Sequence, residues 1–359
     1  LDALAGIAVC NLGHCHPKVV QALQEQAAKL MHISNFFVSE PQVMLSRKLV
    51  ESSGLDRVFF SNSGAESVEG AIKIARKYAH SHGRGGTVIS MENSFHGRTL
   101  ATIATGKKKM QRGFGPMPTG FHKVPFNDIE AVRAAVSDEV AAIILEPVQG
   151  EGGINVAKPC YIRALRELCD RENIVLIFDE IQCGVGRTGA LFAKDHYEVQ
   201  PDIMTLAKGL GSGLPVGAIL SNEKVSSAID FGDHGTTFGG NPMACAAGLA
   251  TLEVIEEEEI LQHTSRKGFW LKEMLDDRLG SHPKLKQIRG LGLMIGIEFD
   301  FPAKPIVMEM MKRGVLANAT AERVLRLVPP LVITYEELEH LADTILAAIN
   351  ELEEKGELH

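Results

Sequence analysis

Two acids, Asp179 and Glu180, stand directly at the end of an apolar run. The run, residues 174–178, has the composition of a buried strand. An acid at the tip of a buried strand needs a cationic partner, and the protonated nitrogen of a bound pyridine ring would provide one. An aspartate that only caps the following turn would have the same local sequence, so both interpretations of Asp179 remain open here.

A lysine, Lys208, lies among glycines just past another apolar run, residues 203–206. A lysine whose surroundings lower its pKa can attack a carbonyl and form a Schiff base. The neighbouring glycines would let a bound group come close to the backbone. A surface lysine in a flexible loop would fit the local sequence equally well.

Two other stretches suit the anionic groups of a ligand. Ser63, Gly64 and Ala65 stand at the start of an expected helix, where backbone N–H groups bind phosphate well. A simple helix N-cap would give the same pattern. In the other stretch, Phe95 stands three residues before Arg98. The ring could stack on a flat ligand, and the guanidinium could hold a carboxylate.

Two further patterns point to functions that we set aside. The glycines of residues 184–189 match G-x-G-x-x-G, the fingerprint of dinucleotide-binding loops. That fingerprint needs a helix that begins inside it and an acid at the end of the next strand, whereas Asp202 precedes a strand. The cysteines and histidines of residues 10–16 fit no closed zinc spacing, so we expect no metal site.

The elements that would position these residues alternate between strand and helix. Short apolar runs predict strands at residues 57–60, 87–90, 140–145, 174–178, 203–206 and 216–220. Amphipathic stretches predict helices at residues 17–31, 41–51, 65–80, 128–136 and 161–172. Apolar strands separated by helices are typical of a parallel sheet that is covered on both faces. Because ligands bind at the carboxyl ends of such strands, we expect the four stretches to meet there.

The pattern changes after about residue 243. Longer helices are expected at residues 244–258, 264–279 and 335–353, with strands at 285–289, 292–299, 315–318 and 324–328. This predicts a smaller α/β domain that the N-terminal residues join. We expect a large domain at residues 34–248 and a small domain formed by residues 1–33 and 249–359, and a chain of 359 residues is long enough for both.

Composition argues against several classes of function. The formal net charge is −8 and the basic residues are scattered, which is atypical of nucleic-acid binding. The one basic run, residues 107–109, is expected to be a solvated loop. No apolar run approaches the ~20 residues that a membrane span needs. Six cysteines without a C-x-x-C pair are too sparse for a disulfide scaffold, so we expect reduced thiols and a cytoplasmic protein.

Several ordered motifs resemble one protein family. They cover residues 62–66, 95–99, 146–153, 178–182, 234–242 and 289–296. With them, the chain resembles the class III pyridoxal-phosphate (PLP) aminotransferases of fold type I along nearly its whole length. The resemblance implies an α/β fold with a large domain, built on a mostly parallel seven-stranded sheet, and a smaller α/β domain. It also implies PLP as the cofactor.

The resemblance assigns roles around that cofactor. Lys208 would bind PLP covalently and then move a proton, and Asp179 would keep the ring nitrogen protonated so that the ring acts as an electron sink. Phe95 and Ile181 would pack against the ring, and Gln182 would lie near its phenolic oxygen. The implied cofactor-binding set is Ser63, Gly64, Ala65, Phe95, Asp179, Glu180, Ile181, Gln182, Lys208 and Thr237.

It also assigns roles toward the substrate and a partner subunit. Thr237 would reach the phosphate held by the other subunit, which implies a homodimer with shared sites, and Thr236 would touch substrate. Arg98 would bind a substrate carboxylate. Glu151 would mask Arg326 in one half-reaction and release it in the other, so that the arginine can hold the α-carboxylate of glutamate.

Within the family, the branch that fits best moves the terminal amine of N-acetylornithine to 2-oxoglutarate. The products would be N-acetylglutamate semialdehyde and glutamate, a step of arginine biosynthesis. Ornithine, succinylornithine and 4-aminobutyrate aminotransferases are alternatives. A glutamate-semialdehyde aminomutase would not need the pair Glu151 and Arg326. A non-catalytic binding protein would be expected to lack Lys208 or Asp179, and both are present.

Overall fold

A seven-stranded sheet forms the centre of the molecule in the computed structural model, which describes residues 1–358. The strand order is β1-β9-β8-β7-β4-β2-β3. The strands are β1 (Arg57–Ser61), β2 (Thr87–Met91), β3 (Phe121–Val124), β4 (Val140–Leu145), β7 (Val175–Asp179), β8 (Ile203–Leu206) and β9 (Gly217–Ser221). Only β9 runs antiparallel to its neighbours. The predicted mostly parallel sheet is therefore confirmed, and the carboxyl ends of the other strands share one edge.

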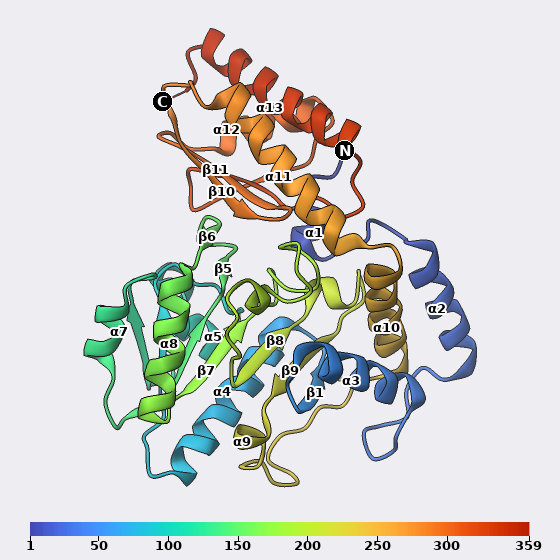
Figure 1. Cartoon of the computed structure of the whole chain (residues 1–359), viewed down its shortest axis with the longest axis vertical. Helices are drawn as coiled ribbons and strands as arrows, with labels where there is room; N and C mark the ends of the chain where they lie inside the picture. The colour runs from blue at the N-terminus through green and yellow to red at the C-terminus, as the bar shows by residue number, and fades with distance from the viewer. Residues whose placement is uncertain (359) are drawn as a thin grey trace.

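Helices cover both faces of this sheet, as Figure 1 shows. Along β4, Ala142 and Ile144 pack in the cluster of α4 (Gly64–Ser81), whereas Ile143 and Leu145 pack in the cluster of α8 (Pro159–Glu172) and α7 (Ile129–Ala135). Side chains alternate in this way because successive residues of a strand point to opposite faces. Both faces of the strand are buried, which explains why its sequence is apolar throughout.

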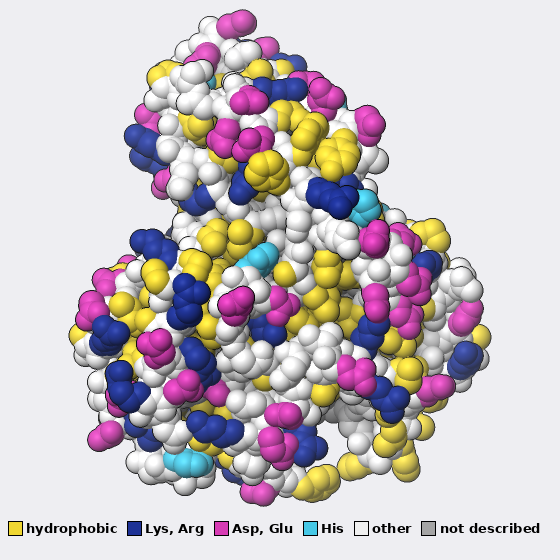
Figure 2. Space-filling view, viewed as in Figure 1, with side chains coloured by type: hydrophobic (Ala, Val, Ile, Leu, Met, Phe, Trp, Pro, Cys, Tyr) yellow, Lys and Arg dark blue, Asp and Glu magenta, His cyan; other side chains and the backbone are white. Residues whose placement is uncertain are grey.

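A second, smaller sheet lies apart from the first, and Figure 2 shows a narrower waist between the two parts. Its antiparallel strands, in the order β10-β11-β13-β12, are β10 (Leu285–Leu291), β11 (Met294–Phe299), β12 (Asn318–Thr320) and β13 (Val324–Leu327). The helices of this part are α11 (Ile260–Leu279), α12 (Lys304–Lys312) and α13 (Tyr335–Glu354). A seven-stranded and a four-stranded unit match the expected fold class. The division at residues 34 and 248 stays a prediction.

The N-terminal residues lie beside the small sheet, and one of its strands is therefore shorter than expected. Asp2 forms a parallel bridge with Leu316, and the Ala3 N–H donates to the Leu316 carbonyl at 2.8 Å. Leu316 therefore pairs with the chain start, and β12 begins only at Asn318 instead of spanning the predicted 315–318. Next in the chain, α2 (Pro17–Lys29) packs on α10 (Pro242–Glu257), which also packs on α3 (Glu40–Ser53).

Several short elements have no counterpart in the sequence prediction. They are α1 (Ala5–Ala8), α5 (Leu100–Thr105), α6 (Lys108–Gln111), β5 (Val148–Gln149), β6 (Asn155–Val156), α9 (Glu223–Ser226), the 3₁₀ turns η1 (Ala193–His196) and η2 (Lys208–Leu210), and also β3 and α12. Among residues 1–358, no helix is both long and apolar enough to cross a membrane. All six cysteines are free.

Candidate active site

A cavity of about 440 Å³ lies at the carboxyl edge of the large sheet. Its walls come from the segments that follow β1, β2, β4, β7 and β8. The lining includes Asn62, Ser63, Gly64, Ala65, Phe95, His96, Arg98, Glu146, Asp179, Ile181, Gln182 and Lys208. The four stretches singled out in the sequence therefore meet at one place, as a parallel sheet requires.

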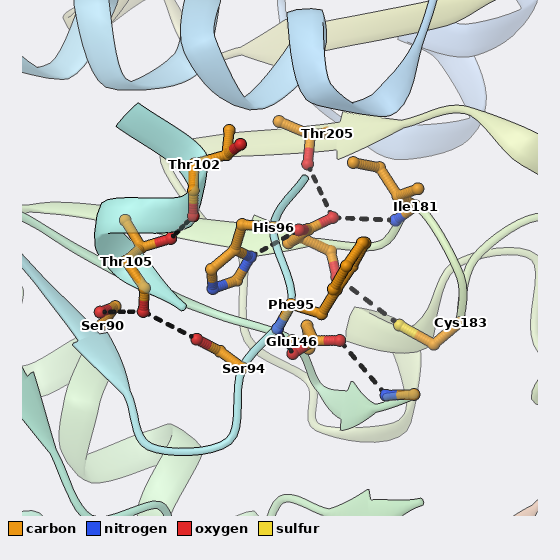
Figure 3. A network of polar contacts seen from close by, with 12 residues as sticks. Ser90, Ser94, Phe95, His96, Thr102, Thr105, Glu146, Ile181, Cys183 and Thr205 are labelled. Atoms are coloured by element: carbon orange, nitrogen blue, oxygen red, sulfur yellow. Dashed lines mark hydrogen bonds and ion pairs between the residues drawn. The ribbon is translucent and has the colours of Figure 1, made fainter. Parts of the chain in front are cut away.

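Asp179, the last residue of β7, is buried and is part of the lining of this cavity. Figure 3 shows three residues that contact its carboxylate, His96, Ile181 and Thr205. One carboxylate oxygen lies 2.6 Å from His96 Nδ1. The other accepts hydrogen bonds from the Ile181 N–H and the Thr205 hydroxyl, both at 3.1 Å. Burial acts to lower the pKa of His96, but the hydrogen bond and charge of Asp179 outweigh it and raise that pKa. The acid is thus fixed in orientation, and a carboxylate in this network suits a cationic ring nitrogen.

Lys208 follows β8 and begins the 3₁₀ turn η2. Its backbone has φ +43°, a left-handed conformation that is uncommon outside glycine and that often marks functional sites. Burial lowers the pKa of Lys208, Arg326 acts in the same direction, and the carboxylates of Glu151 and Asp179 oppose both. Within residues 1–358, the Nζ atom makes no hydrogen bond or ion pair. A lysine of lowered pKa with a free amine is suited to attack a carbonyl.

The first turn of α4 forms another wall. The Ser63 hydroxyl accepts a hydrogen bond from the Glu66 N–H at 3.3 Å and caps the helix. Gly64 and Ala65 line the cavity just beyond. A Cβ on Gly64 would lie 2.9 Å from the Ile181 side chain, so any other residue there would displace Ile181. The two interpretations of this stretch are compatible, because the serine caps the helix while its N-terminus faces the cavity, where an anion is favoured.

Phe95, Ile181 and Arg98 also line the cavity. The Arg98 side chain is exposed and lies 5.3 Å from the centre of the Phe95 ring. The Phe95 N–H donates to Glu146 at 3.0 Å, and the Gly150 N–H donates to the other oxygen of that carboxylate at 3.2 Å. Burial raises the pKa of Glu146 to about 7. This acid, which the sequence analysis missed, ties the Phe95 loop to the turn that carries Glu151.

Glu151 and Arg326 form an ion pair beside the cavity. The Arg326 guanidinium also donates to Gln182 Oε1 at 3.1 Å and to Asn318 Oδ1 at 3.0 Å. Its Nη2 atom is buried without a partner among the described residues. Burial acts to raise the pKa of Glu151, but the charge and hydrogen bond of Arg326, together with Lys208 and Gln182, outweigh it, so the pKa is lowered and the acid stays ionised. Gln182, which accepts from Arg326, is part of the cavity lining, so it connects the ion pair to the cavity.

Some expected residues lie elsewhere. Glu180 is not part of the cavity lining, because its carboxylate accepts from the backbone N–H groups of Ala193 and Lys194, at 2.5 and 2.8 Å, on the other side of the chain. Thr236 and Thr237 line a separate surface hollow together with Phe36 and neighbouring residues.

The sequence analysis also missed contributions from other segments. Val9 and residues 214–216 line the cavity, although no role at a site was expected of them. Lys107 was expected in a solvated loop, but its Nζ donates to the Glu151 carbonyl at 3.2 Å, and the Thr320 hydroxyl donates to the same oxygen at 2.8 Å. Lys108 and Lys109 are exposed as expected.

The chain belongs to the class III aminotransferases: residues 1–349 match that family. It is 55% identical over 355 residues to an acetylornithine aminotransferase of Methanocaldococcus jannaschii, covering 98% of this chain and 88% of that protein. It is 49% identical to an acetylornithine aminotransferase of Caldanaerobacter subterraneus, covering 97% and 90%. Among solved structures, it is similar to an ornithine aminotransferase of Toxoplasma gondii, with a TM-score of 0.95, 38% identity, and 99% and 87% coverage.

Enzymes of this class depend on PLP. The cavity suits that group in its chemistry. The helix N-terminus at Gly64, which has no side chain, suits a phosphate. The buried and oriented carboxylate of Asp179 suits a ring nitrogen. The free amine of Lys208 suits an aldehyde.

Proposed function

We propose that this chain transfers the terminal amine of N-acetylornithine to 2-oxoglutarate and returns glutamate. The observation that carries the proposal is the ion pair of Glu151 with the buried Arg326, next to a cavity that also holds Arg98 at its exposed side. One arginine that is always available and one that can be masked suit two substrates with different numbers of carboxylates. The names of the two relatives described above support this choice of substrate.

The cofactor residues we propose are those that line the cavity. Lys208 would hold PLP, Asp179 would face its ring nitrogen, and the start of α4 at Gly64 would receive its phosphate. Phe95 and Ile181, which line the same cavity, would enclose the ring. When bound, PLP supplies an electron sink for the carbon from which a proton is removed.

The protein groups would orient the substrate and move the proton. Lys208 Nζ, at lowered pKa, would carry the proton away from the carbon that bears the transferred amine. The hydrogen bonds of His96 and Thr205 hold the Asp179 carboxylate in one orientation. Arg98 would bind the single carboxylate of N-acetylornithine.

Arg326 would serve the second substrate. With Glu151 paired to it, the guanidinium is neutralised and does not attract a further carboxylate. When the pair opens, Arg326 is free for the α-carboxylate of glutamate, and its unpartnered Nη2 provides an additional donor. An aminomutase, which rearranges one molecule, has no use for such a device.

We also propose a homodimer with shared sites. Thr237 lies outside the cavity of its own chain, in a hollow of about 850 Å³ lined by the aromatic residues Phe36, Phe37 and Phe231. These rings are between 62% and 102% exposed, an unusual apolar patch for a surface that faces water. A second copy placed there would bury them and bring Thr237 toward the phosphate of the other site.

The test is a panel of amine donors with 2-oxoglutarate as acceptor. N-acetylornithine should give the highest kcat/KM, above ornithine, N-succinylornithine and 4-aminobutyrate. A higher kcat/KM for one of these donors would replace the proposed substrate. No glutamate formation from any of them would contradict the transaminase assignment.

A further inference from the structure

The loop of residues 184–189, whose glycines match a dinucleotide-binding fingerprint, is buried against protein. Residues 184–188 are all buried, and no helix begins within the loop. A Cβ on Gly189 would lie 2.2 Å from Ser265 Oγ of α11, and a Cβ on Gly292 would lie 2.4 Å from the Thr188 carbonyl carbon. The glycines therefore allow close contact with the small-sheet part of the molecule and leave no room for a phosphate.

The guanidinium of Arg187, inside this loop, is fully buried and forms no ion pair among residues 1–358. It donates instead to the carbonyl oxygen of Leu293 at 3.0 Å, to that of Pro329, and to Asn11 Oδ1 at 2.7 Å. Burial lowers the pKa of Arg187 to about 9, so the side chain is still a cation near neutral pH. A buried cation without an acid is costly unless its hydrogen bonds are well placed. Arg187 therefore holds three separate segments at fixed positions.

The two carbonyls lie at the end of the strand pair that is nearest to Arg326. Leu293 immediately precedes β11, and Pro329 follows β13, which is antiparallel to it. Arg326 pairs with Gly296 in this ladder, close to the anchored end. The Leu293 N–H also donates to the Arg187 carbonyl at 3.2 Å. Arg187 thus joins the strand that carries Arg326 to the loop that follows Asp179 and Gln182.

Asn11 extends this anchor to the turn that carries Lys208. Its Nδ2 atom donates to the Val185 carbonyl at 2.8 Å, while its Oδ1 accepts from Arg187. A Cβ on Gly209 would lie 2.3 Å from Asn11 Nδ2, so the amide packs directly on the backbone beside Lys208. The same cluster therefore borders both the proposed cofactor lysine and the strand of the proposed substrate arginine.

We propose that Arg187 is a positioning residue for the glutamate half of the reaction, because it sets the place of Arg326 relative to Lys208. The inference rests on the proposed role of Arg326 in holding the α-carboxylate of glutamate. Arg187 does not line the cavity, so it acts through Arg326. A displaced Arg326 weakens the binding of dicarboxylates, whereas N-acetylornithine, with its carboxylate on Arg98, is little affected.

The experiment compares Arg187→Met with Arg326→Met and with a control, Arg166→Met. Methionine keeps much of the length of the side chain but cannot donate to the three oxygens. Arg166 on α8 is another mostly buried arginine, paired with Asp202 at 3.0 Å and Asp170 at 2.7 Å, and it touches neither Arg326 nor the Arg187 cluster. The measurements on each holoenzyme are the dissociation constant of glutarate, an unreactive dicarboxylate, by calorimetry, and the single-turnover rate of each half-reaction.

Arg187→Met should weaken glutarate binding and raise the glutamate concentration for half-maximal rate at least about tenfold, since small displacements of a binding group have large effects. The rate of the N-acetylornithine half-reaction should stay within about threefold of the wild-type rate, because Arg98, which would bind that substrate, is not displaced. Arg166→Met should lower the melting temperature without favouring either half-reaction.

The inference is overturned if Arg187→Met slows both half-reactions equally or leaves glutarate binding unchanged. The proposed function still holds in that case, provided that Arg326→Met slows the glutamate half-reaction more than the N-acetylornithine half-reaction. If Arg326→Met is not selective, the proposed function fails and the inference with it. Should Arg187→Met not fold, Asn11→Ala removes one of the three acceptors of Arg187. Asn11→Ala should weaken glutarate binding and slow the glutamate half-reaction by about threefold, and should leave the N-acetylornithine half-reaction unchanged. Equal slowing of both half-reactions by Asn11→Ala overturns the inference.

Discussion

The guanidinium of Arg326 is completely buried, whereas the carboxylate of Glu151 that neutralises it is 29% exposed. Arg326 is held from the side by Asn318 and Gln182, and the main-chain oxygen of Glu151 is held by Lys107 and Thr320. The Glu151 side chain is the one part of the pair that can swing toward solvent. In the proposed cycle, the pair would therefore open by movement of the acid, with the arginine staying in place.

Replacing Glu151 by glutamine should affect the two half-reactions differently. Glu151→Gln removes the charge and keeps the size, so Arg326 is no longer neutralised. The glutamate half-reaction should be unchanged or faster, and the N-acetylornithine half-reaction should slow by about tenfold or more, since a partly buried pair of this kind is worth roughly 1–3 kcal/mol. Single-turnover spectroscopy of each half-reaction measures both rates. Equal slowing would show that Glu151 is only structural, and the exposed Glu167→Gln serves as control.

Lys208 should be the residue that binds the cofactor covalently. Reduction of the holoenzyme with borohydride should fix PLP on the peptide that contains Lys208, as read by mass spectrometry. Lys208→Ala should lower kcat at least about 10²-fold, because it removes the group that moves the proton. A label on another lysine would mean that the site has been assigned to the wrong residue.

Mixing two inactive variants should restore part of the activity if sites are shared between subunits. A heterodimer of Lys208→Ala and Thr237→Ala contains one site with both substitutions and one site with neither. About half of the wild-type activity per heterodimer is expected on this geometry. Verified heterodimers that remain inactive would show that each chain builds its site alone.

Glu180 should make stability depend on pH, with a definite sign. Burial raises its pKa to about 8, well above the ordinary value of 4.5. The folded state therefore keeps a proton that the unfolded state releases between these values, so stability falls as pH rises from about 4.5 to 8 and levels off above. Relative to Glu180→Gln, the wild type should lose up to roughly 1.4 kcal/mol per pH unit in this window. Denaturant unfolding at several pH values measures the difference, and a pH-independent difference would contradict the shift.

The strands that the sequence predicted well are those whose two faces are both buried. Residues 140–145 were expected as a strand, and β4 has the same bounds. β3 was missed because only one of its four residues is buried, and β6 because both of its residues are only partly buried, so no apolar run marks either strand. The predicted strand at residues 315–318 was placed too early, because Leu316 pairs with Asp2 and Ala3 at the start of the chain instead of with the small sheet.

The sequence by itself determined which strand ends meet at the cavity. In a parallel sheet the carboxyl ends share an edge, and the residues after each apolar run must therefore meet there. Tertiary structure decided which of them face inward. Asp179 turns into the cavity and its neighbour Glu180 turns away, because successive side chains alternate in an extended chain. It also decided the contacts of Arg326 with Glu151 and of Arg187 with Asn11, which join residues 175 and 176 positions apart. No local pattern specifies such contacts, since they depend on how the small sheet packs against the large one.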